Sequence, residues 1–419
     1  MARRPLFFYG WYVVITGAIT MALAYGIRHT FSVFFPPILD EFGWSRGSTA
    51  FIYSLNLVVY GILGPLTGSL ADRWKPRTLS LIGFVVLSFA TAGCALAQEL
   101  WHFYVLYGLL VPLGTSFVGW PIIAPALTNW FVKRRGMALG LGQMGGGMGF
   151  VYGIFVTFVI SQIGWRYTYV VLAGILLVVL LPLQRLFFHY RPEDKGMKAY
   201  GAEELLLMSR TMETAGAHDW TFRQAVKTPR LWLLVISQSF YWGLGCYLVL
   251  AHQVRFAEDV GYTSTFAASI LALFGVCMTA GQFLGFLSDR IGREMTVSLA
   301  SMSAIIAIIA LLLVKDTSQP WLLYLYAVGL GLGAGVYSPT IVAGAADIFH
   351  GKHFGAIAGL LLTGMGMGGI IGPWLGGYIY DVTGSYSLAF FLCIGFFFLS
   401  CIVFWLAAPR HAHKIILKA

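Results

Sequence analysis

Two adjacent residues with chemically active side chains, Arg28 and His29, lie well inside the first long apolar stretch of the sequence. The 17 Asp and Glu residues, and the other Lys and Arg residues, lie within or near the short segments between the apolar stretches. A guanidinium keeps its proton, and its burial in lipid costs several kcal/mol or more. No carboxylate lies at the same depth to neutralise Arg28, so the sequence predicts that an anion binds there. A carboxylate suits this role, because the planar guanidinium binds it through two parallel hydrogen bonds.

Arg28 has a structural alternative. About 12 Å of helix, at ~1.5 Å per residue, separates it from Pro36, and a long Arg side chain can extend that far toward the membrane surface. Charged residues within transmembrane segments usually mark substrate or ion paths, however. The sequence therefore favours the anion-binding interpretation.

His29 is the titratable group at this depth whose unperturbed pKa, about 6.5, lies near physiological pH. Burial and the neighbouring Arg28 both disfavour the imidazolium form, and a bound anion would favour it. Anion and proton would then bind cooperatively, which is a symport mechanism. The alternative is a structural histidine that hydrogen-bonds between helices. Adjacent residues also point about 100° apart on a helix, so both side chains need not reach one ligand.

The composition predicts an all-α membrane protein. Hydrophobic residues make up 58% of the chain and charged residues 11%, and the mean hydropathy is +0.78. A hydrocarbon core roughly 30 Å thick needs about 20 apolar residues per helix. Twelve stretches meet this length and predict 12 transmembrane helices, at residues 10–36, 48–70, 79–97, 101–128, 136–161, 166–188, 230–256, 264–287, 295–314, 320–344, 354–380 and 385–407.

The distribution of positive charge predicts the orientation. Most Lys and Arg residues fall in the termini and in the segments on the same side of the membrane, and the other side has only Arg46, Arg166, Arg255 and Lys315. By the positive-inside rule, both termini are expected in the cytoplasm, with the protein in the cytoplasmic (inner) membrane. The net charge of +10 thus reflects orientation and does not indicate a nucleic-acid partner.

The chain contains an internal sequence repeat. Residues 68–73, which follow the second stretch, recur as residues 285–290 after the eighth. Residues 130–140 recur as 349–359, and Gly164 matches Gly384. These matches predict two six-helix bundles, residues 1–188 and 230–419, joined by a cytoplasmic linker at 189–229. Repeats of this kind rock against each other around a site near the midplane of the bilayer.

The sequence resembles the major facilitator superfamily over essentially its full length, because Gly-x-Leu-x-Asp-Arg is that superfamily's mark between helices 2 and 3. The resemblance implies the major facilitator fold. The first copy departs from the pattern, since Lys75 stands where the family usually has Gly. The pattern predicts a turn in which an Asp caps a helix and pairs with Arg to hold one gate closed. The gating residues are then Asp72, Arg73, Asp289, Arg290 and Arg293.

Within the superfamily, the chain is similar to the monocarboxylate porter and oxalate:formate antiporter group. The similarity rests on Tyr-Gly-Trp at residues 9–11, on residues 25–35, and on Phe-Gly-Trp-Ser-Arg at 42–46. Members of the group often carry an Arg in helix 8, sometimes with an Asp one turn earlier. Gly281 and Cys277 stand at those positions here, and Met365 stands where some oxalate exchangers have a Lys. Lactate or oxalate is therefore not inherited as the substrate.

The resemblance places further polar and aromatic residues around a central cavity. In addition to Arg28 and His29, the residues expected to line it are Tyr25, Asn56, Trp120, Gln143, Gln238, Tyr241, Gln282 and Tyr337. His29 is also the expected proton-coupling residue. Each of the others alone is more typical of helix packing.

These observations predict a secondary transporter for a small organic anion, most simply a monocarboxylate carried together with protons. It would be driven by a gradient without a cofactor or metal, would act as a monomer, and would not be an enzyme. One alternative is anion exchange without a proton, in which His29 is structural. Another is a sensor that binds a ligand without moving it, although the terminal tails are too short to hold a signalling domain.

Overall fold

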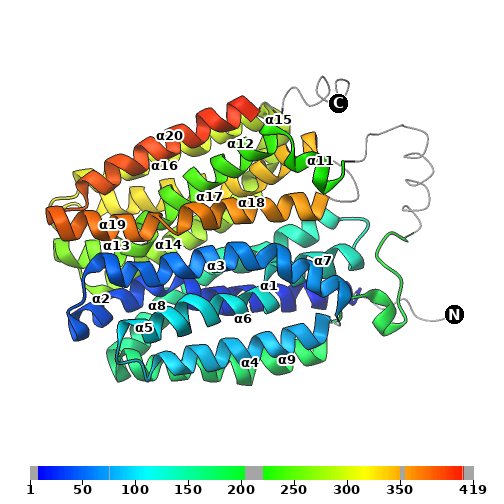
Figure 1. Ribbon diagram of the computed structural model, residues 1–419, viewed down its shortest axis with the longest axis horizontal. Helices are drawn as coiled ribbons and strands as arrows, with labels where there is room; N and C mark the ends of the chain where they lie inside the picture. The colour runs from blue at the N-terminus through cyan, green and yellow to red at the C-terminus, as the bar shows by residue number, and fades with distance from the viewer. Residues whose placement is uncertain (1–7, 75, 203–219, 350–353, 408, 410–419) are drawn as a thin grey trace.

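The computed structural model describes residues 8–74, 76–202, 220–349, 354–407 and 409, without the side chains of residues 69, 71–73 and 135. Regular structure in this part of the chain is helical, apart from an isolated bridge between Phe131 and Tyr200. The helices form two groups that lie against each other with their long axes roughly parallel (Figure 1).

The first group holds the helices of the N-terminal part of the chain. They are α1 (Gly10–His29), α2 (Phe31–Phe42), α3 (Arg46–Arg73), α4 (Pro76–Cys94), α5 (Leu100–Phe103), α6 (Val111–Val118), α7 (Trp120–Trp130), α8 (Arg135–Ile175) and α9 (Leu181–Phe187). Two π-helical segments, Tyr104–Leu110 and Leu176–Leu180, continue the helices beside them, and a 3-10 turn follows at Pro192–Lys195.

The second group holds the C-terminal helices. They are α11 (Phe222–Val226), α12 (Pro229–Gln238), α13 (Tyr247–Val260), α14 (Ser264–Phe283), α15 (Leu287–Ile291), α16 (Arg293–Leu313), α17 (Pro320–Ile348), α18 (Phe354–Gly369), α19 (Gly372–Thr383) and α20 (Ser387–Ala407). A π-helical segment, Ser239–Cys246, joins α12 to α13, and a 3-10 turn, Leu284–Phe286, joins α14 to α15.

The described residues include 11 helical runs that are long and apolar enough to cross a membrane. One of them, Gly136–Phe187, has 52 residues and changes direction at Gly164, whose φ of 79° and ψ of 163° are not helical. Glycine adopts such a positive φ without steric cost. This run therefore supplies two of the expected spans, and the prediction of an all-α protein with 12 membrane helices is confirmed.

Two of the expected helices are interrupted near the middle of the bundle. The first apolar stretch was expected to run without a break, but it divides at Thr30, directly after Arg28 and His29. The fourth divides at Gly119, whose extended backbone separates α6 from α7. Pro121, in the first turn of α7, has no N–H to donate to a carbonyl of the preceding helix α6.

The two ends of the bundle differ in how closely the groups approach. The linker face carries residues 8–10, 187–202 and 220–229, and the far face carries residues 40–46, 258–264 and 381–387 (right and left in Figure 1). Near the far face α3 touches α19: a methyl group added at Gly377 would lie 2.6 Å from the Arg46 carbonyl oxygen. Toward the linker face, one added at Gly68 would have no neighbour within 4 Å.

The contact between α8 and α14 diverges in the same direction. A methyl group added at Gly275 would lie 2.6 Å from the Gly147 carbonyl oxygen, but one added at Gly140 or Gly136 would have no neighbour within 4 Å. The two groups of helices are thus in close contact from the far face to the middle of the bundle, and glycines nearer the linker face have open space beside them.

Candidate functional site

Arg28 lies in the last turn of α1 and is 2% exposed. Its Nε donates a hydrogen bond of 2.7 Å to Oδ1 of Asn56 in α3, and Asn56 Nδ2 donates to the Tyr107 carbonyl at 2.8 Å. The guanidinium carbon also lies 4.0 Å from the centre of the Tyr60 ring, in a cation–π contact. These neighbours are neutral, so they orient Arg28 without cancelling its charge.

The terminal nitrogens of Arg28 remain available for a ligand. Among the described residues, no ion pair includes Arg28, and no hydrogen bond reaches either of its Nη groups. Because Asn56 occupies only Nε, the two Nη groups can bind both oxygens of one carboxylate end-on. The geometry suits an anion-binding residue.

Tyr25 connects Arg28 to the interrupted fourth helix. Its hydroxyl is hydrogen-bonded to the Tyr60 hydroxyl and accepts a hydrogen bond of 3.4 Å from the backbone N–H of Trp120, the first residue of α7. The N-terminus of a helix carries partial positive charge, which favours an anion. Interrupted helices whose N-termini face an anionic substrate are typical of transporter binding sites.

The break after α1 leaves backbone groups that need partners inside the bundle. The Tyr107 hydroxyl lies 2.8 Å from the Ile27 carbonyl and 3.2 Å from the Arg28 carbonyl, so it donates to this freed backbone. The Thr30 hydroxyl donates to the Gly26 carbonyl at 2.7 Å. Arg28 and His29 therefore lie at a helix end where the carbonyls of Gly26, Ile27 and Arg28 have hydrogen-bond partners.

Four tyrosines that sequence reasoning did not select surround Arg28. The guanidinium lies 4.0 Å from the centre of the Tyr60 ring, and the Tyr107 hydroxyl donates a hydrogen bond to the Arg28 carbonyl. Tyr53 and Tyr247 lie near the same guanidinium. Tyr247 comes from α13, and its ring meets that of Tyr53 edge-on at 5.8 Å, across the boundary between the two groups of helices. The available signal was the spacing of Tyr53, Asn56 and Tyr60, which places all three on one face of α3.

His29 points toward a different neighbour from Arg28. Its ring stacks on Phe150 of α8, with centroids 3.8 Å apart, and it is 8% exposed. Nδ1 is buried without a hydrogen-bond partner, although the ring interacts with the Gly146 carbonyl. Tyr25 contacts both residues, at 5.8 Å from the His29 ring and 5.6 Å from the Arg28 guanidinium.

The remaining expected lining residues lie apart from Arg28. Tyr241 and Tyr337 are fully buried and stack at 3.8 Å inside the C-terminal group, where Tyr241 donates to the Ala300 carbonyl and Tyr337 bonds Ser237. Gln238 and Gln282 each have a buried Oε1 without a hydrogen-bond partner. Gln143 is half-buried in α8.

The second copy of the gating motif forms an ion-pair network at the linker face. Arg293 Nη1 lies 2.5 Å from Asp289 Oδ1, and Arg293 Nε lies 2.9 Å from Asp347 Oδ2 in α17. The N-cap of α16 is Gly292, with no side-chain hydrogen bond, so the Asp289 partner here is Arg293 and not a helix end. Arg290 lies over the Phe286 ring. The side chains of Asp72 and Arg73, and all of Lys75, lie outside the description.

Comparison with known proteins identifies the family. The sequence model of the Major Facilitator Superfamily matches residues 17–329 and 239–419. The chain belongs to the major facilitator superfamily. It is therefore an integral membrane protein and a transporter, and not an enzyme, as the sequence predicted.

Curated relatives resemble the chain over nearly its whole length. Monocarboxylate transporter 11 of Homo sapiens is 26% identical over 416 residues, which cover 96% of this chain and 83% of that protein. Monocarboxylate transporter 13 of Rattus norvegicus is 25% identical, with 91% and 85% covered. Monocarboxylate transporter 2 of Mus musculus is 24% identical, with 90% and 80% covered. The predicted similarity to the monocarboxylate porters is confirmed.

Solved structures share the fold. A bacterial homolog of the human lysosomal transporter Spinster, in an inward-facing and occupied conformation, superposes with a TM-score of 0.69 at 17% identity, and 98% of each chain is covered. The unoccupied inward-facing structure gives a TM-score of 0.68 at 19% identity. The major facilitator fold predicted from the sequence is thereby confirmed.

Proposed function

We propose that this transporter carries a small organic anion, most simply a monocarboxylate, and that protons move with it. The observation that supports this is Arg28: a buried guanidinium that is oriented by neutral groups, has two free Nη groups and is connected through Tyr25 to the N-terminus of α7. The names of the curated relatives point to the same class of substrate. The chain would act as a monomer, without cofactor or metal.

In this proposal the linker face is cytoplasmic, because most Lys and Arg residues lie on that side. The division into bundles at residues 1–188 and 230–419 then gives two bodies that rock around Arg28. The open space beside Gly68, Gly136 and Gly140 toward the linker face, together with the closed far face, supports assigning this state as the one open to the cytoplasm. The Asp289–Arg293–Asp347 network belongs to the gate on that side.

Proton coupling is assigned to His29. The unpartnered Nδ1 can take up a proton, and an anion on neighbouring Arg28 would favour the charged ring, so each ligand strengthens the binding of the other. The second candidate is anion exchange without a proton. The stacking of His29 on Phe150 favours that candidate, because it gives the ring a packing role.

Counterflow in proteoliposomes tests the proposal. Vesicles loaded with unlabelled acetate, lactate, pyruvate, formate or oxalate should accumulate the same labelled carboxylate transiently when the substrate is correct. An inward-directed pH gradient should then drive net uptake of that substrate into empty vesicles. Counterflow without pH-driven uptake would support exchange instead. No counterflow with any carboxylate, while a neutral or cationic solute exchanges, would overturn the proposal.

A further inference from the structure

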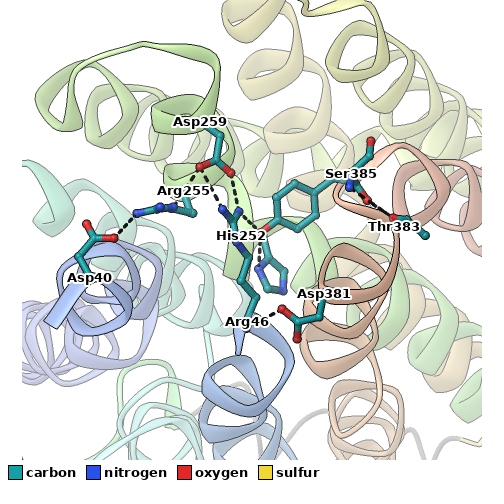
Figure 2. Close-up of polar contacts among 9 residues, drawn as sticks. Asp40, Arg46, His252, Arg255, Asp259, Asp381, Thr383 and Ser385 are labelled. Carbon is teal, nitrogen blue, oxygen red and sulfur yellow. Dashed lines mark hydrogen bonds and ion pairs between the residues drawn. The ribbon is translucent and has the colours of Figure 1, made fainter. Parts of the chain in front are cut away.

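We infer that α3 and α19 form a latch at the far face, in which each helix caps the N-terminus of the other, and that this latch must open in every transport cycle. The inference rests on the proposed alternating access for its functional meaning. Its residues are Asp40, Arg46, Ser54, His252, Arg255, Asp259, Asp381 and Tyr386, most of which Figure 2 shows.

Asp381 of α19 caps α3. Its Oδ1 accepts a hydrogen bond of 2.9 Å from the backbone N–H of Arg46, and its Oδ2 accepts one of 2.7 Å from that of Gly47. These amides belong to the first turn of α3, where the helix offers no acceptor of its own. Ser45, the N-cap within the same segment, accepts only from Ser48 N. A carboxylate of one group of helices thus completes a helix end of the other.

The capping is reciprocal. The Ser54 hydroxyl, about two turns along α3, accepts a hydrogen bond of 3.1 Å from the backbone N–H of Trp374, in the first turn of α19. No side chain within the α19 segment caps its N-terminus. Each helix therefore depends on the other to satisfy its first-turn amides, and separating them exposes both sets at once.

Arg46 adds an ion pair to the capped helix end. Its Nη1 lies 2.5 Å from Oδ2 of Asp259 and its Nη2 lies 3.0 Å from Oδ1, a bidentate arrangement. Nη1 also donates to the Tyr386 hydroxyl at 2.9 Å, and the guanidinium lies 3.6 Å from the centre of the Tyr380 ring. All three partners belong to the C-terminal group, and Figure 2 shows Asp259 beside Arg46.

In a second ion pair the arginine comes from the C-terminal group and the carboxylate from the N-terminal group. Arg255 of α13 donates to Asp40 of α2 at 2.7 Å, and its Nε lies 3.1 Å from Asp259 Oδ1. Asp259 consequently holds both arginines, one from each group of helices. Among the described residues, Arg46–Asp259 and Arg255–Asp40 are the ion pairs that join the two groups, and both lie at the far face.

His252 fixes the position of Tyr386. Its Nε2 lies 2.8 Å from the Pro373 carbonyl, which can only accept, so Nε2 carries the hydrogen. Nδ1 is then the acceptor for the Tyr386 hydroxyl at 3.2 Å. The histidine is fully buried, and Phe35 of α2 meets its ring edge-on at 5.1 Å. This hydrogen-bond chain aims the Tyr386 oxygen at Arg46.

The backbones themselves touch at this point. A methyl group on Gly377 would lie 2.6 Å from the carbonyl carbon and oxygen of Arg46 and from Gly47 N, and one on Gly47 would lie 3.0 Å from Asp381 Oδ2. Glycine at position 377 allows this close approach of the backbones, and glycine at position 47 leaves room for the Asp381 carboxylate. Rocking the two groups of helices to the opposite state opens the far face, and this must break the caps and both ion pairs.

A matched ion pair on the same face supplies the control. The Glu41 carboxylate forms an ion pair of 2.7 Å with Arg166 and accepts a hydrogen bond of 2.6 Å from Trp165 Nε1. All three residues belong to the N-terminal group. Breaking this pair removes a comparable interaction without touching the boundary between the groups. A latch variant and the Glu41→Gln variant should therefore differ in conformation even if they lose similar stability.

The test measures the far-face distance between spin labels on Gln98→Cys and Ser318→Cys, both exposed, in full-length protein with Cys277 and Cys401 replaced by Ser. Asp381→Asn keeps one acceptor oxygen but loses the charge and the second acceptor, and Arg46→Gln loses the bidentate pair. Each variant should raise the ratio of molecules with a long distance between the two labels to molecules with a short one. We expect a rise of about five-fold or more, within the usual range of conformational coupling. Glu41→Gln should leave that ratio as in the unmodified pair.

Asp40→Asn, at a side chain that is 63% exposed, provides a milder variant that keeps the fold if the others do not express. A folded Asp381→Asn or Asp40→Asn protein with an unchanged distance ratio would overturn the latch, as would an equal shift with Glu41→Gln. The measurement uses no substrate. Failure of counterflow with every carboxylate would overturn the proposed function and leave the distance result standing.

Discussion

At the scale of single residues, the main feature is the positive charge of Arg28, which no acidic side chain among the described residues neutralises. The guanidinium is 2% exposed, and its described partners, an amide and a ring of tyrosines, are neutral. Two opposite charges 4 Å apart attract by roughly 4 kcal/mol at an effective dielectric constant of about 20. A bound carboxylate would therefore recover part of the desolvation cost of the buried guanidinium.

Asn56→Ala should weaken anion binding while the protein stays folded. The substitution removes the hydrogen bond that aligns Nε of Arg28, and a hydrogen bond to a charged group contributes about 1.5–3 kcal/mol, which is about 10- to 150-fold in affinity. Titration calorimetry on purified protein measures it. Gln184→Ala is the control, because Gln184 is also buried but bonds Thr20, away from Arg28. Equal losses in both variants would show that Asn56 acts only through stability.

His29→Gln should uncouple the transporter. Glutamine can fill the space beside Phe150 and form hydrogen bonds, but it takes up no proton near pH 6. The variant should exchange labelled for unlabelled anion at equilibrium at close to the normal rate. It should fail to concentrate the anion when an inward-directed pH gradient is applied. Accumulation equal to that of the unmodified protein would assign the proton to another group or to the substrate.

At the scale of helices, the two interrupted segments create the site. Tyr25 and Arg28 are neighbours on α1, and the break at Gly119 frees the first N–H of α7 to bond the Tyr25 hydroxyl, which a continuous helix would not allow. The apolar length of each stretch predicted its span, but hydropathy carries no information about a break within it. Pro121 was the available signal for α7, whereas the Thr30 break has no comparable residue, since Pro36 and Pro37 lie inside α2.

Gly119→Ala should disturb the site through the helix break. A methyl group there would lie 2.6 Å from the Thr115 carbonyl oxygen and 2.8 Å from a ring carbon of Tyr25, so the ring must move. We expect weaker anion binding together with a loss of about 1–3 kcal/mol in stability, as for other overpacked positions. The binding titration and thermal unfolding measure the two effects. Gly174→Ala, with no neighbour within 4 Å, is the control and should change neither.

At the scale of the whole molecule, the sequence predicted the fold because apolar length, the internal repeat and the charge asymmetry are all local or periodic signals. Among the eight further residues that the resemblance placed around a cavity, Tyr25 and Asn56 contact Arg28 in the structure. The positions of Tyr241 and Tyr337, inside the C-terminal group, depend on which face of each helix turns inward. The boundaries at residues 188 and 230 stay predictions.

The far-face latch could not be predicted for a related reason. Its residues come from four separate segments, at 40–54, 252–259, 373–377 and 381–386, and each looks like an ordinary loop or interfacial residue by itself. Their meeting is a result of how the two groups of helices dock. The sequence shows which charged and polar residues such a cluster contains, but it does not predict that the packing of the two groups of helices brings them together.

The central claim is that Arg28 binds the transported anion, and ligand-dependent thermal stabilisation of purified protein tests it most directly. A ligand at 100 times its Kd adds about 2.7 kcal/mol of stability. The unmodified protein should show this rise with the carboxylate identified by counterflow, and Arg166→Gln, which removes an arginine of the far face, should show it too. Arg28→Gln should unfold at a temperature that the carboxylate does not change. Stabilisation of Arg28→Gln at the same carboxylate concentrations as the unmodified protein would contradict the account.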